Sequence, residues 1–193
     1  MDTRNLIESV NKHVTLTAEE SAYFASVMLP LQLKQGEMPE KIGETTRYFI
    51  HVYSGCLMSY LTDKEGTDHV MQFATAGWWT GDLPSYTKQI PSLYTTRALT
   101  ESEVLLLPRM AFDELLERVP KVERYFRILF QNSLVTHQDR LMQNLSATAE
   151  ERYIAFGKKY PSLEQYVPQK YIASYLGITP EFLSKIRRKM MEK

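Results

Sequence analysis

The sequence predicts an α+β protein in which an N-terminal double-stranded β-helix, or jelly roll, is followed by helices. Six of the eight glycines lie in the first half of the chain, between short runs rich in aromatic and β-branched residues. After Met110 the spacing of apolar residues changes from two to about 3.6 residues, which is typical of helices. The last segment is basic and has the pattern of two helices joined by a turn.

Five runs in the first half predict strands because they are short and rich in residues that favour a pleated backbone. They are RYFIHVY, CLMSYL, HVMQFA, LYTTRAL and EVLLL. The segment TDKEGTD has the polar, glycine-bearing composition of a hairpin loop, and SG and AG mark tighter turns. Many short antiparallel strands at this spacing indicate a barrel or jelly roll, which we assign to residues 1–120.

The segment MAFDELLERV predicts a first helix, which Pro108 precedes and Pro120 closes. No glycine or proline interrupts residues 121–145, and a helix of that length spans about 35 Å. Apolar residues recur along it at Val122, Tyr125, Phe126, Leu129, Phe130, Leu134, Leu141 and Leu145.

This long helix has two interpretations, a core helix lying across the barrel or a helix that packs on its copy in a homodimer. The arc covered by its four aromatic and leucine residues between positions 125 and 130 is wider than one barrel face should need, which favours the dimer. The predicted interface comprises Phe126, Leu129, Leu134, Leu141 and Leu145.

A hinge is expected after the long helix. Thr148 and Glu151 have the spacing of a capping box, so a new helix should begin there. The domain boundary therefore lies near Ser146, with residues 121–146 forming the long helix and hinge and residues 147–193 forming a terminal domain.

The terminal segment YIASYLGITPEFLSKIRRK predicts a helix-turn-helix. Its first helix carries Ile172, Ala173 and Leu176 on one face, and Gly177 permits the turn. Thr179 is suited to cap the second helix, and Pro180 fits its first position. The apolar repeat of the second helix consists of Leu183, Ile186 and Met190.

A polar stripe opposite that repeat suits contact with DNA, with base-reading side chains near the helix start and cations along it. The candidate DNA contacts are Gln169, Thr179, Glu181, Ser184, Lys185, Arg188 and Lys189. A plain helical hairpin would show the same apolar pattern. Three features favour DNA: Ala173 and Gly177 where the two helices cross and turn, the basic outer face, and the position at one chain end.

The charge distribution supports this interpretation, although the net charge of zero taken alone argues against it. Residues 168–193 hold six cations and two anions, so that stretch is basic and the remainder is acidic. The sequence contains neither a membrane-spanning run nor a secretory signal, and we expect a cytoplasmic protein. The single cysteine, Cys56, is expected to be a buried hydrophobe.

The order of these elements resembles the Crp/Fnr transcriptional regulators across essentially the whole chain. The local matches are QNLSATAEERYIAF at the hinge, GDL near the sensor pocket and IASYLGITPEFLSKI at the DNA reader. The resemblance implies a homodimer that binds a palindromic DNA operator, and a β-roll and long helix that respond to an effector. RNA polymerase is a further candidate partner, and neither a cofactor nor catalysis is expected.

The residues expected to line the effector pocket differ from those of the family members that bind cyclic nucleotides. Gly81 is followed by Asp82 instead of glutamate, and Ser92 and Leu93 occupy the place of the arginine–serine pair that clamps the phosphate. Leucine cannot donate a charge-assisted hydrogen bond, so we expect an effector other than cyclic AMP. Arg97 is the one nearby cation that could replace the clamp, although an exposed strand position is the simpler expectation.

Other departures from the family concern the contacts to the base of a cyclic nucleotide and the recognition of the DNA operator. Gln138 and Asp139 occupy the long-helix positions that the resemblance assigns to base contacts, in place of a threonine–serine pair. Pro180 lies where members often carry a DNA-reading arginine, so the operator should differ from the family's best-known one. The sequence stops at Lys193, soon after the second helix, and we expect no full β-wing.

Two further classes of protein remain as alternatives. A cupin-type enzyme would need a histidine-rich metal cluster, whereas His51 and His69 lie far apart and no His-x-His accompanies them. An adaptor whose terminal helices contact another protein is the second alternative. Trp78 and Trp79 are consecutive, so in a strand one points inward and the other outward, which favours packing over ligand stacking.

Overall fold

The computed structural model describes residues 3–191, and its centre is a β-roll of two antiparallel sheets. The four-stranded sheet has the order β1 (Leu29–Leu33), β7 (Ser102–Pro108), β2 (Tyr48–Ser54) and β5 (Trp79–Thr80). The three-stranded sheet has the order β4 (Asp68–Thr75), β3 (Cys56–Thr62) and β6 (Thr95–Ala98). All five predicted strand runs lie in these sheets, which confirms a β-roll in an α+β fold.

The turns between strands lie where the sequence predicted them. The hairpin between β3 and β4 contains the predicted polar loop, and Cys56 pairs with Thr75 at the far end of that ladder. Gly55, between β2 and β3, has a φ of +88°, and a Cβ there would lie 2.2 Å from Oγ of Ser102. This tight crossing therefore requires glycine.

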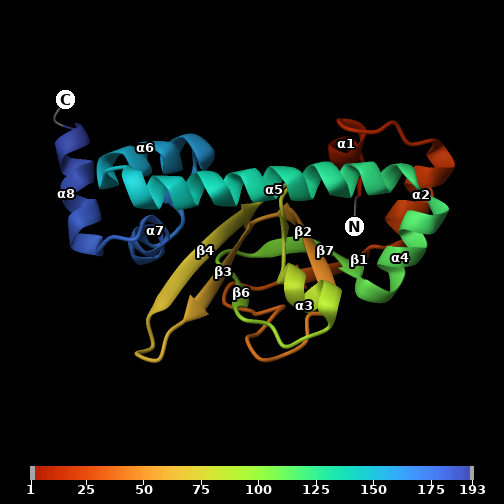
Figure 1. The fold of residues 1–193 in the computed structure, drawn as a ribbon, viewed down its shortest axis with the longest axis horizontal. Coiled ribbons are helices and arrows are strands. Elements are labelled where there is room, and N and C mark those ends of the chain that lie inside the picture. The colour runs from red at the N-terminus through yellow and green to blue at the C-terminus, as the bar shows by residue number, and fades with distance from the viewer. Residues whose placement is uncertain (1–2, 192–193) are drawn as a thin grey trace.

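Helices flank the roll at both ends and along one side (Figure 1). At one end lie α1 (Arg4–Asn11), α2 (Ala18–Val27) and α4 (Arg109–Arg118), and α3 (Leu83–Lys88) follows β5. The long α5 (Lys121–Ser146) crosses the whole molecule. At its far end lie α6 (Ala149–Lys159), the short 3-10 helix η1 (Leu163–Gln165), α7 (Gln169–Leu176) and α8 (Pro180–Met191).

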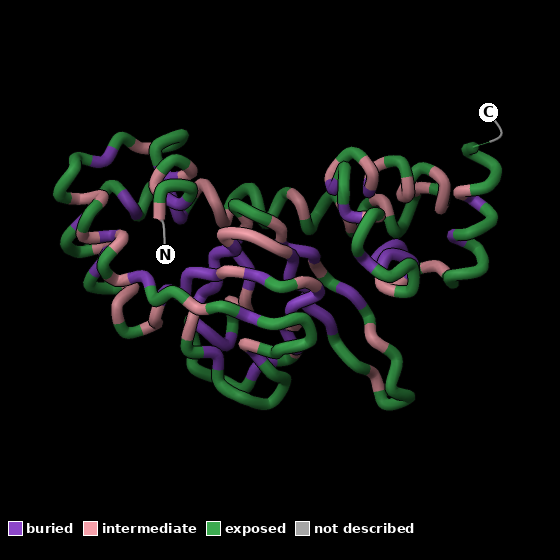
Figure 2. Tube along the Cα trace, turned by 180° about the vertical axis from the view of Figure 1, so that it is seen from behind, coloured by how far each residue is buried: buried purple, intermediate pink, exposed green. Residues whose placement is uncertain are grey.

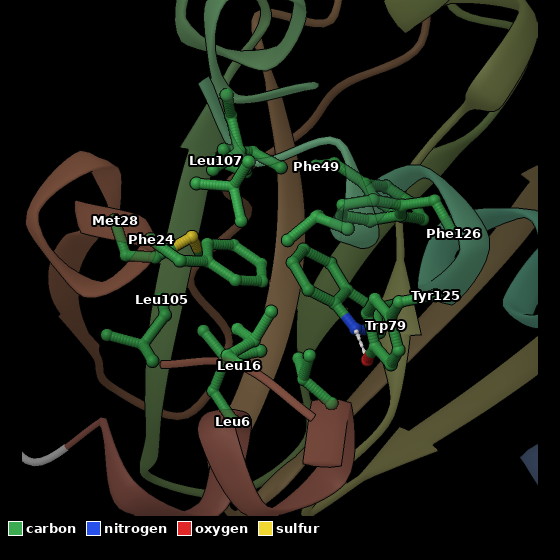
Figure 3. Packing of buried hydrophobic residues seen from close by; sticks show 14 of the residues in the cluster. Leu6, Leu16, Phe24, Met28, Phe49, Trp79, Leu105, Leu107, Tyr125 and Phe126 are labelled. Carbon is green, nitrogen blue, oxygen red and sulfur yellow. Dashed lines mark hydrogen bonds between the residues drawn. The ribbon is translucent and has the colours of Figure 1, made fainter. Parts of the chain in front are cut away.

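The first turns of α5 are held by an aromatic core beneath α1, α2 and α4 (Figure 3). The indole N–H of Trp79 donates a hydrogen bond to Oη of Tyr125 at 2.8 Å. The ring of Phe126 packs edge-on against Trp79 and Phe112, with ring centroids 5.4 and 5.0 Å apart. These contacts join α5, β5 and α4 into one buried unit.

This packing corrects the predicted dimer interface. Phe126 is 2% exposed and Leu129 is partly buried against the same core, so both side chains face their own chain. The wide arc of α5 is explained by α1, α2 and α4, which cover a side of the helix that a bare roll would leave open. Leu134, Leu141 and Leu145 remain exposed, as a dimer interface requires.

Buried residues lie along both sheets and in the helices at either end of the roll (Figure 2). Their apolar side chains form three clusters. One cluster fills the roll between the two sheets, and Cys56 belongs to another, which joins the roll to α6 and α7. Burial raises the pKa of the Cys56 thiol to about 12, as expected for an inert apolar position. None of the helices in residues 3–191 is both long and apolar enough to cross a membrane.

The structure confirms two predicted junctions between helices, the capping box of Thr148 and Glu151 and the turn at Gly177. Thr148 accepts a hydrogen bond from the N–H of Glu151, and the Glu151 carboxylate accepts one from the N–H of Thr148. This reciprocal pair begins α6, and two residues separate the end of α5 from the start of α6. At the second junction, Gly177 has the left-handed φ of +67° that its place after α7 requires.

His51 is the one described histidine that lies wholly buried, on β2 beneath α1. Neither ring nitrogen has a hydrogen-bond partner among residues 3–191, and the ring packs edge-on against Trp79. Burial lowers the pKa of His51 from about 6.5 to about 4, because the interior disfavours the imidazolium. The neutral ring is therefore part of the apolar core.

We expect this histidine to weaken the fold in acid. Between pH 6.5 and 4 the unfolded chain binds a proton that the folded chain excludes, so the free energy of unfolding falls as pH is lowered, by up to about 3 kcal/mol. In His51→Leu that component should be lost, which urea unfolding across this pH range measures. The exposed His69→Gln variant is the control and should retain it. Parallel pH profiles of His51→Leu and the unsubstituted protein would contradict the assignment.

Candidate functional site

The terminal helices α7 and α8 form a compact pair. The N–H of Ile178 donates to the carbonyl of Ala173 across the turn, and Thr179 caps α8 by accepting from the N–H of Phe182 at 3.2 Å. The inner faces of the two helices are buried, with Ala173 and Leu183 fully inaccessible to solvent. Sealing of this inner face leaves the opposite face of α8 in solvent.

The seven predicted contact residues are all exposed, although an ion pair turns one of them, Lys189, toward α6. Oγ of Ser184 donates to the carbonyl of Pro180 at 3.0 Å and lies 3.4 Å from Oε1 of Gln169. Within residues 3–191, neither Lys185 nor Arg188 forms an ion pair. Two cations on one helix face are therefore available to an external anion.

The remaining cations of α8 face other elements. Lys189 pairs with Glu150 of α6, and Arg187 lies 3.6 Å from the carboxylate of Glu164. The ring of Phe182 is 47% exposed beside the polar stripe, and the sequence reasoning missed it. Its signal was an aromatic residue that falls outside the apolar repeat of the helix.

The helix pair is tied to the β-roll through α7. Ser174 accepts a hydrogen bond from the N–H of Val70 at 2.9 Å and donates to the carbonyl of Asp68 at 2.6 Å. The hydroxyl of Tyr160, at the end of α6, donates to the carbonyl of Phe73. The terminal domain and β4 consequently share one buried cluster.

A cavity of about 670 Å³ lies between the roll and α5, and we call it the roll cavity. Its lining is mostly apolar: Ile42, Phe49, Leu61, Met71, Gln72, Trp79, Thr80, Gly81, Asp82, Leu83, Pro84, Leu93, Tyr94, Leu129, Phe130, Ser133 and His137. Three of the predicted pocket residues, Gly81, Asp82 and Leu93, are among them. Such a lining suits an apolar ligand with few polar groups.

In the wall of this cavity, the carboxylate of Asp82 accepts the hydrogen bonds of the nearby donor groups. It accepts hydrogen bonds from the N–H of Ser85 at 3.0 Å and from the N–H of Leu93 at 2.8 Å. Oγ of Ser92 lies 3.0 Å from the same carboxylate. Donors that could hold the oxygens of a bound anion are thus already satisfied by the protein's own acid.

A second buried carboxylate supports Asp82. Glu40 accepts hydrogen bonds from the N–H of Asp82 at 2.9 Å and from the hydroxyls of Thr46 and Thr96. Burial raises the pKa of Glu40, while these hydrogen bonds oppose that rise. The cluster of Glu40 and Asp82 contains two acids, which disfavours a phosphate group nearby.

The other predicted pocket residues lie elsewhere in the single chain. Arg97 pairs with Met58 across the ladder, and its guanidinium lies 4.9 Å from the ring centre of Tyr60, on the outer face of the sheet. Its neighbour Thr96 points inward, so the two-residue period of the strand directs Arg97 away from the cavity. Arg97 therefore lies outside the roll cavity, but it is half-buried with its Nε shielded from solvent, so it is not the exposed strand residue that the sequence suggested.

On α5, Gln138 and Asp139 are exposed and do not line the roll cavity. Ser133 and His137 face it instead. They follow Leu129 at intervals of four residues, and this spacing could have identified them in the sequence. Outside the cavity, α5 exposes an apolar stripe: Leu134, Val135, Leu141, Met142 and Leu145.

The metal alternative has no cluster to support it. Residues 3–191 contain no group of three or more histidine, cysteine, aspartate or glutamate side chains placed to bind a metal. His51 is sealed in the core, whereas His69 lies in the exposed hairpin with Nε2 2.6 Å from the Asp63 carboxylate. The two histidines therefore do not converge on one site.

Comparison with known proteins agrees with this architecture. Residues 30–119 match the family model described as cyclic nucleotide-binding domain. The chain is 26% identical over 165 residues to the fumarate and nitrate reduction regulatory protein of Vibrio cholerae, and 26% identical to electron transport regulator A of Shewanella oneidensis. Each match covers 80% of this chain, and the chain spans 65% of the length of these curated relatives.

Among solved structures, FixK2 from Bradyrhizobium japonicum aligns with a TM-score of 0.73 at 19% identity, over 86% of this chain and 85% of that one. The catabolite activator protein of Thermus thermophilus aligns with a TM-score of 0.60 at 19% identity, over 95% and 87%. The β-roll, its flanking helices and the cavity beneath α5 thus define a protein with a cyclic nucleotide-binding type of domain. The regulators that it matches belong to the Crp/Fnr family, and the chain is similar to them in sequence and in fold.

We expect cyclic AMP and cyclic GMP to bind weakly. Absence of a charged donor for a buried phosphate costs on the order of 2–5 kcal/mol, about 30-fold to several thousand-fold in affinity. Calorimetric titration should show dissociation constants weaker than about 10 µM, the order of magnitude left after such a loss. Asp82→Ala, which frees the donors, is the matched variant. Tight binding of either nucleotide by the unsubstituted protein would show that another group replaces the clamp.

Proposed function

We propose that this chain is a DNA-binding transcriptional regulator of the Crp/Fnr type. The observation that carries the proposal is the outer face of α8, where Lys185 and Arg188 are exposed and unpaired among residues 3–191 while Leu183 is fully buried on the opposite face. A helix so oriented offers cations to phosphates and short polar side chains to base edges. Residues 147–193 form the proposed helix-turn-helix domain, with α8 as its reading helix.

The proposed assembly is a homodimer formed through the second half of α5. Leu134, Leu141 and Leu145 recur at spacings of seven and four residues, so they lie along one side of the helix, and none of them lines the roll cavity. Two copies packed along this stripe would carry two α8 helices, which suits a palindromic operator with half-sites about 34–36 Å apart. RNA polymerase is a further proposed partner.

The proposed division of labour assigns residues 1–120 to sensing, residues 121–146 to dimerisation and residues 147–193 to DNA. A small effector other than cyclic AMP would bind beneath α5, since the roll cavity is apolar and the buried acids disfavour a phosphate there. The proposed role is binding and not catalysis. A protein-binding adaptor is the rival, because the exposed ring of Phe182 would also suit a protein surface.

We expect Lys185→Ala and Arg188→Ala to weaken DNA binding without unfolding the protein, because both side chains are solvent-exposed. A lost phosphate contact lowers the salt slope by about one and affects all sequences similarly, whereas a lost base contact costs about 1–3 kcal/mol at one operator position.

Selection from random DNA followed by fluorescence anisotropy at several salt concentrations measures both effects. Lys88→Ala, an exposed lysine on α3, is the control and should bind as the unsubstituted protein does. If selection enriches no palindrome and the double variant Lys185→Ala with Arg188→Ala binds generic duplex unchanged, the proposed regulator function is wrong and the adaptor function takes its place.

A second expectation concerns the dimer. Leu134→Glu or Leu141→Glu should yield a folded monomer, because a two-fold contact would bury two unpaired carboxylates while the isolated subunit leaves both positions in solvent. Light scattering at micromolar concentration with circular dichroism measures this. Met110→Glu, which replaces an exposed methionine on α4, should remain dimeric. A monomeric unsubstituted protein would contradict the assembly.

A further inference from the structure

A second cavity of about 270 Å³ adjoins the roll cavity where β4, α5, α6 and α7 meet, and we call it the junction cavity. The two cavities share wall residues: Met71, Gln72, Trp79, Leu129, Ser133 and His137. They therefore form one continuous groove along the inner face of α5. Arg140 and Lys159 line only the junction end.

Arg140 is held firmly at that end. Its guanidinium donates hydrogen bonds to the carbonyls of Val70, Met71 and Tyr175, and it lies 4.1 Å from the ring centre of Tyr175. These three bonds use three of its five N–H donors. All three acceptors are neutral, so its charge has no carboxylate partner among residues 3–191.

Lys159 brings a second cation to the same space. Its Nζ lies 5.4 Å from the ring centre of Trp78 and 5.3 Å from that of Tyr160. Burial lowers the pKa of Lys159, the charge of Arg140 lowers it further, and the charge of Asp139 opposes both effects. No aspartate or glutamate of residues 3–191 lines the junction cavity itself, so two like charges face it from a half-buried site. Asp139 borders a neighbouring pocket that both cations also line.

The rest of the groove has the opposite character. Beyond Leu129 the walls are formed by Phe130, Leu83 and Ile42, and the carboxylate of Asp82 is already satisfied by its own hydrogen bonds. An occupant that matches both ends needs an anionic group and an apolar body. A carboxylate fits the cationic end, because it can accept from the two remaining Arg140 donors and from Lys159.

We propose that the groove beneath α5 binds a small carboxylic acid with an apolar body, its carboxylate between Arg140 and Lys159 and its body directed toward the roll cavity. A role for this ligand as the effector rests on the proposed function, whereas its binding does not. Arg140 connects α5 to both β4 and α7 through its other donors, so an anion on its two remaining donors would lie beside the contact that holds the terminal domain to the roll and would offset its charge.

Tryptophan fluorescence provides a direct test, since the chain has two tryptophans and both Trp78 and Trp79 line the junction cavity. Decanoate is the probe, decanol has the same apolar body without the charge, and acetate has the charge without the body. Decanoate should produce a saturable change with at least tenfold higher affinity than either. Equal affinity for decanol, or no saturable change with decanoate, would overturn the proposal.

The matched variants separate a site from nonspecific adsorption. Lys159→Gln should weaken decanoate binding about tenfold or more and leave decanol within about twofold, because a hydrogen bond to a charged group is lost. Lys159→Arg should restore it, and Lys12→Gln, on the exposed end of α1, should have no effect. Unchanged decanoate affinity in folded Lys159→Gln would overturn the site. All titrations omit DNA, so their outcome is independent of whether α8 binds DNA.

Discussion

The buried contact of Tyr125 and Phe126 with Trp79 fixes the direction of α5, and the positions of the other helices depend on that direction. A helix of 26 residues anchored at one end by an aromatic core extends well beyond the domain that anchors it. The roll lies under its middle, the N-terminal helices surround its start, and the terminal domain lies at its end (Figure 1). If α5 rotated about its axis, the cavity and the exposed stripe would both be lost.

The two sides of α5 have different chemical characters because only one is covered by its own chain. The covered side changes along the helix from aromatic at Phe126, through Ser133 and His137, to cationic at Arg140. The uncovered side remains apolar at Leu134, Leu141 and Leu145, which is unusual for a surface in water. One helix can therefore connect a proposed ligand site, a proposed subunit contact and the terminal domain without further structural elements.

The acidic cluster at Asp82 determines what one wall of the roll cavity offers a ligand. The backbone N–H groups of Ser85 and Leu93 are directed at the same position on that wall. That point is occupied by a carboxylate of the chain itself, which stabilises the turn into α3 and accepts the available hydrogen bonds. A neutral or differently placed charged group is consequently the kind of ligand the remaining space accommodates.

Local sequence signals determined much of this protein. Strand runs, the uninterrupted long helix, the Thr148–Glu151 capping box and the glycine turn at Gly177 could all be predicted, since each depends on residues close together in the chain. The N-terminal helices α1 and α2 were not assigned, and without them the aromatic arc of α5 was interpreted as a dimer surface.

Only the tertiary structure decided which way the functional side chains point. Phe126 and Leu129 face inward because distant helices cover them, Arg97 faces outward because of its strand register, and Asp82 turns into its own donors. Arg140 joins α5 to β4 and α7, and Lys159 of α6 lines the same cavity. Such arrangements depend on contacts between residues far apart in sequence, and periodicity within one element carries no information about its neighbours.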